Sequence, residues 1–269
     1  MIPVSDFMLG IIGAGNMGTA ILQGGLRSGV MSPGRVWLAN PHLEKIAPFG
    51  ELGVNITTSN IEAVRHADIL LLAVKPQVLP SVLEEIRPAV GERCVVSIAA
   101  GISRGWLREQ LPGARVICAM PNTPLVVGCG ATALTEADGV PEEQYRFVQA
   151  LFSAAGLVCV LPPEQMNAII PVSGSSPAFF FRMARLMVEE AARSGIDPET
   201  ALAMTAKTME GAARMLQSSG RTAGELERQV CSPGGTTLAA LTAFDELGFD
   251  RMIELAFARC IRRAEELGR

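Results

Sequence analysis

The 269-residue sequence predicts an α/β fold, with a parallel sheet in its N-terminal part and an all-α C-terminal domain. Short β-branched apolar runs alternate with helix-compatible stretches as far as residue 161. After Pro162-Pro163 these runs end, and the chain becomes rich in Ala, Met, Leu and Glu. The change predicts one domain over residues 1–162 and a second, helical domain over residues 163–269.

The first predicted strand, residues 7–12, leads into Gly13-Ala14-Gly15-Asn16-Met17-Gly18, and a helix is predicted over residues 19–27. Gly13 permits a tight turn, Gly15 leaves no side chain between backbone and ligand, and Gly18 lets the helix pack close to the strand. The helix N-terminus then suits a pyrophosphate. Placed between a strand and a helix, this motif predicts a Rossmann-like dinucleotide-binding domain rather than a merely structural glycine turn.

Further strands are predicted over residues 35–39, 54–57, 69–74, 94–98, 115–120, 131–134 and 158–161, with helices starting at Asn60 and spanning 141–155. The run 69–74 is apolar at every position, as in a strand covered on both faces. Three consecutive strands end in polar or glycine-rich loops, at residues 75–77, 99–101 and 121–124. Because ligands bind at the carboxyl ends of parallel strands, we expect these loops to meet a cofactor.

The second strand ends at Asn40, where an acidic residue would bind the adenosine ribose and repel a 2′-phosphate. No carboxylate precedes Glu44, which favours NADPH over NADH as the cofactor. His42 and Lys45 are then candidates for contacting the phosphate, or are simply solvated surface residues.

Helices are predicted over residues 177–193, 198–217, 237–247 and 250–267. The first is apolar around most of its circumference, and such a helix is normally buried. A helical domain of this size cannot easily bury it alone, which predicts an interlocked homodimer through the helical domain.

The formal net charge of −4 and a pI near 5.4 argue against a nucleic-acid partner. Although mean hydropathy is +0.31, no apolar run approaches the roughly 18 residues of a membrane span. With no secretory leader in view, we expect a cytoplasmic protein that hides apolar surface between subunits. The six cysteines lack C-x-x-C spacing, so we expect no metal site or disulfide and mostly buried thiols.

Two loops in the helical part combine hydroxyl groups with glycine. Ser173-Gly174-Ser175-Ser176-Pro177 precedes a helix and offers a carboxylate site, although an N-cap serine would account for part of it. Cys231-Ser232-Pro233-Gly234-Gly235-Thr236-Thr237 opens another helix.

General acid–base candidates are scarce. Neither of the two histidines, His42 and His66, falls in a loop expected to face a nicotinamide, and Tyr145 has no lysine four residues on. Lys207 lies in an Ala- and Met-rich helix, where a surface lysine is the expected reading. A redox enzyme without such a residue suits a substrate that already carries its proton, such as an iminium ion.

The successive motifs resemble those of pyrroline-5-carboxylate reductases over nearly the whole chain. They are the segments 13–18, 73–77, 97–101, 120–124, 173–178 and 232–237. The resemblance implies hydride transfer from NAD(P)H to C5 of 1-pyrroline-5-carboxylate, which yields L-proline in the last step of proline biosynthesis. It also implies a helical domain that swaps around its partner in a homodimer, often in a ring of five dimers.

Residue by residue, the resemblance and the strand ends give two predicted sets. The cofactor set is Gly13, Ala14, Gly15, Asn16, Met17, Gly18, Asn40, Asn60, Ala73, Val74, Lys75, Pro76, Ala99 and Ala100. The substrate set is Asn122, Ser173, Gln229, Ser232, Gly235, Thr236 and Thr237. In the family the last threonine of its loop hydrogen-bonds the ring nitrogen, which assigns Thr237 a catalytic positioning role.

Four positions depart from the common family pattern: Ser176 for Gly, Phe179 for Tyr, Asn167 for Asp and Gln229 for Asn. Two other readings stay open. One is a different two-domain oxidoreductase, such as a 3-hydroxyacid dehydrogenase, which would need a catalytic lysine in the helical domain. The other is a non-catalytic dinucleotide-binding protein.

Overall fold

The computed structural model describes residues 6–268, which form two compact units. The sheet unit comprises the chain up to Pro177 together with the segment from Cys260 onward, and the helical unit is Ala178–Arg259. The division predicted after residue 162 was drawn from composition and stays a prediction.

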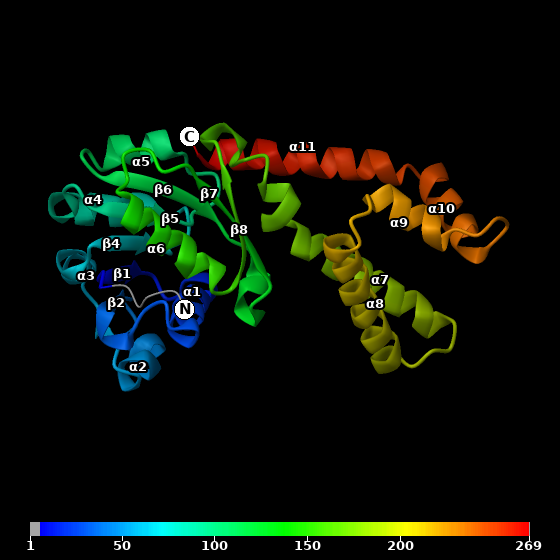
Figure 1. Ribbon diagram of the computed structural model, residues 1–269, viewed down its shortest axis with the longest axis horizontal. Coiled ribbons are helices and arrows are strands. Elements are labelled where there is room, and N and C mark those ends of the chain that lie inside the picture. Colours follow the sequence, from blue (N-terminus) through cyan, green and yellow to red (C-terminus); the bar gives the residue numbers. More distant parts are fainter. Residues whose placement is uncertain (1–5, 269) are drawn as a thin grey trace. The chain divides into compact units, whose positions relative to one another are not determined.

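One eight-stranded sheet forms the centre of the sheet unit, in the order β3-β2-β1-β4-β5-β6-β7-β8 (Figure 1). Its strands are β1 Leu9–Ile12, β2 Val36–Ala39, β3 Asn55–Thr57, β4 Ile69–Leu72, β5 Cys94–Ser97, β6 Arg115–Met120, β7 Gly130–Thr135 and β8 Gly156–Leu161. All neighbouring pairs are parallel except β6 and β7. In register, Ile12 lies opposite both Ala39 and Leu72, so the carboxyl ends of β2, β1 and β4 are level.

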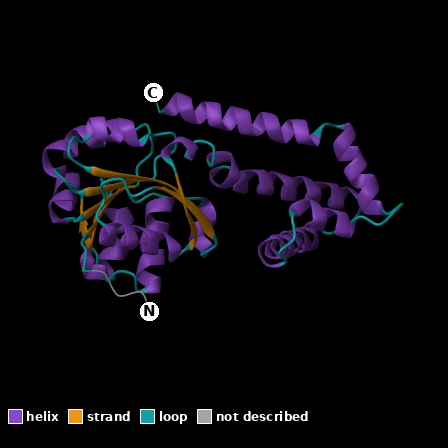
Figure 2. Ribbon diagram, turned by 45° about the horizontal axis from the view of Figure 1, so that its top comes forward, coloured by secondary structure: helices purple, strands orange, loops and turns teal. Residues whose placement is uncertain are grey.

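Helices cover both faces of the sheet (Figure 2). On one face α1 (Asn16–Ser28) and α6 (Glu142–Ser153) pack with Leu9, Ile11 and Leu71. On the other face α3 (Asn60–His66), α4 (Leu79–Val90) and α5 (Arg104–Gln110) pack with Ile12, Leu70 and Leu72. Successive β4 residues therefore enter opposite apolar layers, which explains why every position of this strand is apolar.

All eight predicted strands are present, whereas several helices were not predicted. Helices α2 (Leu43–Glu51) and α4 contain internal prolines, Pro48 and Pro88, which weaken a sequence-based helix assignment. The short helices α5 and α9 (Ala223–Val230) were also missed, although Thr222 and Glu225 form a capping box at the start of α9. The remaining helices start and end within a few residues of prediction.

The helical unit contains most of α7 (Ser176–Arg193), then α8 (Pro198–Ser218), α9, α10 (Thr236–Glu246) and the first part of α11 (Phe249–Leu267). Between residues 178 and 259, all of which are described, only Ala201 and Thr205 are buried. Large apolar side chains are exposed on its helices, among them Phe180, Phe181, Met183, Leu186, Met187, Leu202, Met204, Met215 and Leu216. In the described part of the chain, none of the helices combines the length and apolarity that crossing a membrane requires.

Candidate active site

The glycine-rich loop has the geometry that its spacing predicts. Gly13 has a positive φ of 101°, its N–H donates to the Ala39 carbonyl at 2.9 Å, and a Cβ there would lie 2.6 Å from the Ala73 carbonyl oxygen. A Cβ on Gly18 would lie 2.6 Å from the Gly13 carbonyl oxygen. Gly15, by contrast, faces open space, because a Cβ on this residue would have no neighbouring side chain or backbone within 4 Å. Two glycines thus serve close packing, and Gly15 leaves room for a ligand.

Helix α1 begins at Asn16 and not at residue 19 as predicted, so its first turn lies inside the motif. Gly15 is the N-cap residue and supplies no side-chain hydrogen bond. The N–H groups of a first helical turn have no partner within the helix, so they are available to a ligand. A helix that begins inside the motif places these N–H groups next to Gly15, where they suit a phosphate.

The three predicted ligand-facing loops follow β4, β5 and β6, which are adjacent parallel strands. Ala73 donates its N–H to the Ile12 carbonyl at 2.8 Å, which holds the start of the loop 73–76 against β1. Ala99 is buried, whereas Lys75 is exposed. At the ends of β5 and β6 a cavity of about 20 Å³ is lined by residues 99–102 and 118–120 together with Met166, Asn167 and Ile170. The sheet therefore brings the predicted cofactor residues to one edge.

Asn40 begins a turn after β2. Its Oδ1 accepts the His42 N–H at 2.9 Å, and its own N–H donates to the Thr57 carbonyl at 3.1 Å. Since Oδ1 is engaged, the Nδ2 group of Asn40 is the part left to meet a ligand. Nearby, Asn60 donates to Glu85 Oε2 at 2.7 Å, while His42 Nδ1 lies 3.4 Å from Glu44 Oε1.

Asn122, a predicted substrate residue, is buried and bridges backbone groups. Its Oδ1 accepts the Ala131 N–H at 2.8 Å, and its Nδ2 donates to the Ser173 carbonyl at 3.1 Å. The side chain thus joins the end of β6 to the start of β7 and to the segment before α7. Its contact with substrate stays a prediction.

The segment before α7 is a π-helix, Ile170–Gly174, rather than an open helix terminus with free serines. Ser173 and Ser176 donate their hydroxyls to the carbonyls of Ile169 (3.4 Å) and Val172 (2.7 Å). The Ser175 N–H donates to the Ile170 carbonyl at 2.7 Å. The π-turn therefore engages the hydroxyl hydrogens of Ser173 and Ser176 locally, and the carboxylate site expected at this terminus stays a prediction. Substrate binding by Ser173 stays a prediction.

In the helical unit, the loop from Ser232 to Gly235 forms a tight turn that starts α10. Gly234 has a positive φ of 68°, and the Gly235 N–H donates to the Ser232 carbonyl at 2.9 Å. A Cβ on Gly235 would lie 2.3 Å from Ser232 Oγ, so a larger residue there would displace the Ser232 hydroxyl. Thr236 and Thr237 are the first two residues of α10, with Thr237 half-buried. In the helix that precedes this loop, the Gln229 side chain accepts a hydrogen bond from Arg221.

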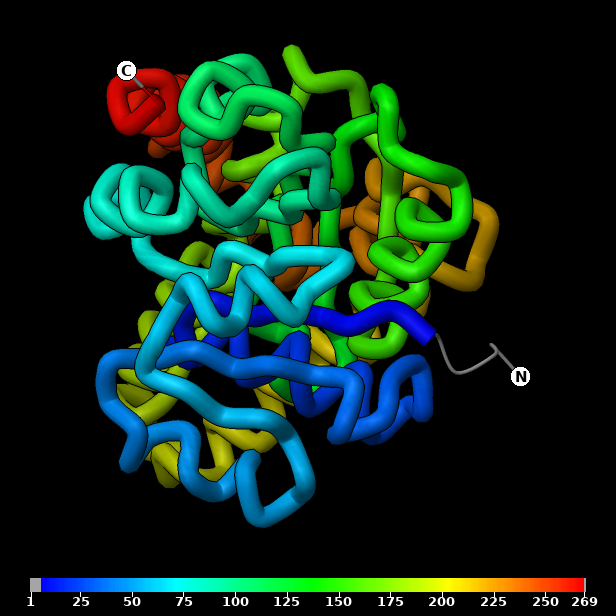
Figure 3. The backbone as a smooth tube through the Cα atoms, turned by 90° about the vertical axis from the view of Figure 1, so that its left-hand side faces the viewer, coloured from blue at the N-terminus to red at the C-terminus, as the bar shows by residue number. Residues whose placement is uncertain are grey.

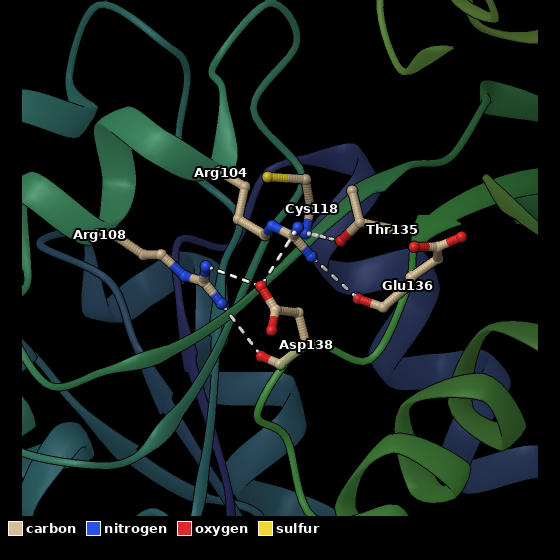
Figure 4. Close-up of polar contacts among 6 residues, drawn as sticks. All are labelled: Arg104, Arg108, Cys118, Thr135, Glu136 and Asp138. Carbon is tan, nitrogen blue, oxygen red and sulfur yellow. Dashed lines mark hydrogen bonds and ion pairs between the residues drawn. The ribbon is translucent and has the colours of Figure 1, made fainter. Parts of the chain in front are cut away.

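A polar cluster that the sequence did not reveal fixes the start of α5 (Figure 4). Arg108 donates to Asp138 Oδ2 at 2.9 Å, and Arg104 lies 3.4 Å from the same oxygen and donates to the Glu136 carbonyl. Hydrogen bonding and charge from Arg108, and the charge of Arg104, lower the pKa of Asp138. The arginines lie about 30 residues from Glu136 and Asp138 in the sequence, so no local sequence pattern predicts these contacts.

The cysteines depart from expectation, since only Cys94 and Cys118 are buried. Burial raises the pKa of each of these thiols to about 12, so both stay protonated. Lys207, the lysine that a hydroxyacid dehydrogenase would need, is exposed and forms an ion pair with Glu210 at 2.8 Å.

Comparison with known proteins gives two family matches. Residues 163–267 match the family described as pyrroline-5-carboxylate reductase dimerisation, and residues 8–101 match the family described as NADP oxidoreductase coenzyme F420-dependent.

Individual relatives match over almost the full chain. The pyrroline-5-carboxylate reductase of Escherichia coli K12 is 36% identical over 264 residues, which are 97% of this chain and 98% of the relative. The structure of a pyrroline-5-carboxylate reductase from Coxiella burnetii has a TM-score of 0.89 at 32% identity and covers 98% of this chain and 100% of its own. The structure of a Plasmodium falciparum pyrroline carboxylate reductase with NADP bound has a TM-score of 0.90 and covers 98% of this chain and 99% of its own. Because the two sequences are only 24% identical, this match shows the fold alone. The chain belongs to the pyrroline-5-carboxylate reductase family.

Proposed function

We propose that this chain reduces 1-pyrroline-5-carboxylate to L-proline with NAD(P)H. The observation that carries the proposal is the glycine loop of residues 13–18 in a chain of this family. Its Gly15 is the N-cap residue of α1, and the space around this residue is open. The loops after β4 and β5 lie at the same edge of the sheet and hold further members of the predicted cofactor set, and the loop after β6 holds Asn122 of the predicted substrate set.

The residues present fit a dinucleotide. The first turn of α1 would hold the pyrophosphate, because its N–H groups and dipole favour an anion. The small side chains of Ala73, Ala99 and Ala100 would let the backbone approach the nicotinamide part. When bound, the reduced nicotinamide supplies the hydride that C5 of the imine receives.

The role of the chain's own residues is mainly to position the imine. We assign Thr237 a hydrogen bond to the ring nitrogen, which aligns the C=N bond for transfer. A threonine hydroxyl has a pKa far above neutrality and is a poor acid, so the substrate enters as an iminium ion that already carries its proton. The N–H groups at the start of α10, beside Ser232 and Gly235, suit the substrate carboxylate.

NADPH is the proposed preferred cofactor, with NADH as the alternative. At the end of β2 the Nδ2 group of Asn40 is a hydrogen-bond donor, and Lys45 is exposed with no ion pair among the described residues. The nearest acidic residue along the chain, Glu44, is paired with His42. Donors and a cation suit a 2′-phosphate better than a carboxylate would.

The proposed assembly is a homodimer through the helical unit, where the exposed apolar side chains of α7 and α8 need a covering surface. A ring of five such dimers and a cytoplasmic location stay predictions.

The deciding experiment follows NADPH oxidation by absorbance after 1-pyrroline-5-carboxylate is added to purified protein, with NADH in parallel and proline identified as product. A matched pair of variants tests the site. Gly18→Ala should abolish oxidation, because its Cβ would collide with the Gly13 carbonyl. Gly34→Ala is the control, because a Cβ on Gly34 would have no neighbour within 4 Å, and it should leave the rate of NADPH oxidation unchanged. Wild-type protein that binds NADPH but oxidises none of it with this imine would refute the proposal.

A further inference from the structure

The C-terminal turn of α11 packs directly on a loop of the proposed cofactor site. We propose that residues 264–268 act as a positioning element for the loop of residues 99–102, and that NADPH affinity depends on this contact. The inference rests on the proposed function, since it takes Ala99 and Ala100 to be cofactor residues.

The loop itself is a tight turn between β5 and α5. The Ala99 N–H donates to Ser97 Oγ at 3.3 Å, and the Ile102 N–H donates to the Ala99 carbonyl at 3.4 Å. Gly101 has a positive φ of 79°, a conformation that other residues rarely adopt. Small shifts at Gly101 therefore move the two alanines that precede it.

Two backbones meet at this point with no side chain between them. A Cβ on Gly101 would lie 2.5 Å from the Ala264 carbonyl oxygen, and a Cβ on Gly268 would lie 2.1 Å from the Gly101 carbonyl oxygen. The Gly268 N–H donates to the Ala264 carbonyl at 3.2 Å, which continues the helical hydrogen-bond pattern of α11 to Gly268. Ala264 is only 4% exposed. Figures 1 and 3 both show the C-terminal end of α11 beside α5.

Both partners of this contact are anchored elsewhere. Ser175 Oγ lies 3.3 Å from Cys260 Sγ, which ties the preceding turn of α11 to the start of α7. On the other side, Arg104 and Arg108 hold α5 to Asp138 (Figure 4). The loop lies between two fixed elements, so the helix end determines where the loop can lie. Misplacement of a binding group by a fraction of an ångström weakens its contacts with a ligand.

Gly268→Ala tests the contact. The φ of Gly268 is not in the left-handed region, so alanine adds one methyl group toward Gly101 without backbone strain. We expect the dissociation constant for NADPH, measured by nucleotide fluorescence, to rise about tenfold. The KM for 1-pyrroline-5-carboxylate at saturating NADPH should change by less than about twofold, because the substrate set lies on other residues. Gly34→Ala, the matched substitution in open space, should change neither value.

A second variant covers the case in which Gly268→Ala does not fold. Leu267→Gly removes the Cβ that faces Gly101, and it should raise the dissociation constant about threefold. If the folded variants had a lower melting temperature but unchanged NADPH affinity, the inference would be overturned, and the contact would contribute only to the stability of the fold. Wild-type protein that binds neither nucleotide would instead refute the proposed function.

Discussion

The sheet unit and the helical unit are built from similarly apolar sequence but use it differently. In the sheet unit, strands such as β4 bury every side chain between two helical layers. In the helical unit only Ala201 and Thr205 are buried, and large side chains such as Phe181 are exposed. The sheet unit therefore buries its own apolar core, whereas the helical unit leaves most of its large apolar side chains exposed.

The largest expected effect tests this difference directly. Phe181, 67% exposed on α7, should be covered by the second copy in the proposed dimer. Phe181→Asp would bury an unpaired charge there and should dissociate the dimer. We expect monomers or aggregates by sedimentation and at least about 100-fold lower kcat/KM.

Leu52→Asp is the control for this variant, because Leu52 is similarly exposed, at 60%, but lies in the sheet unit after α2. Assembly and activity should stay unchanged. If Leu52→Asp also dissociated the protein, the contrast between the units would be wrong.

Thr237→Val tests whether the helical unit positions the substrate in addition to forming the dimer. Valine keeps the shape and deletes the hydroxyl, so one hydrogen bond to a charged group is lost. A cost of about 1.5–3 kcal/mol predicts a roughly 10- to 150-fold lower kcat/KM. Thr242→Val serves as the control, because that hydroxyl only donates to the Leu238 carbonyl within α10. Equal rates for Thr237→Val and wild type would remove the assigned role.

Asn40→Asp tests whether cofactor choice belongs to the sheet unit. The new carboxylate should repel a 2′-phosphate and accept a hydrogen bond from a 2′-hydroxyl. We expect kcat/KM with NADPH to fall about tenfold while the value with NADH holds or rises. Asn40→Ser adds no charge and keeps a hydrogen-bond donor, its hydroxyl, so it should change the ratio much less than Asn40→Asp does. An unchanged ratio in Asn40→Asp would place the selectivity elsewhere.

The smallest effect concerns acid stability of the sheet unit. The pKa of Asp138 in the folded protein is lowered below its ordinary 3.8, chiefly by Arg108. The carboxylate therefore stabilises the fold above pH 3.8, and this contribution is lost as the pH falls through the lowered pKa. Melting temperatures from pH 6 to pH 3 should fall slightly less in Asp138→Asn than in wild type, since Asp138 is exposed. A steeper acid loss in the variant would contradict this sign.

Much of the fold could be predicted because its signals are local. The run 69–74 and the glycine loop specify their own strand and turn. The three strand ends expected to meet a cofactor lie on adjacent parallel strands, and their contact with a cofactor stays a prediction. Helices α2 and α4 were missed because tertiary packing overrides the internal prolines there.

Within the site, the unpredicted features depend on distant partners. The Asn122 side chain bonds to Ala131 and Ser173, and Arg104 pairs with Asp138. The spacing of these residues in the sequence does not indicate that they are in contact. The π-helix before α7 likewise gave no signal, because Ser173 to Pro177 reads equally well as an N-cap.

The return of α11 to the sheet unit also bears on how the protein is made. Residues from Cys260 onward complete a unit whose other part ends at Pro177, so the helical unit is synthesised between them. On the ribosome the nucleotide fold would stay unfinished until α11 has been translated. The contact between Gly101 and Gly268 forms only after the whole helical unit has been synthesised.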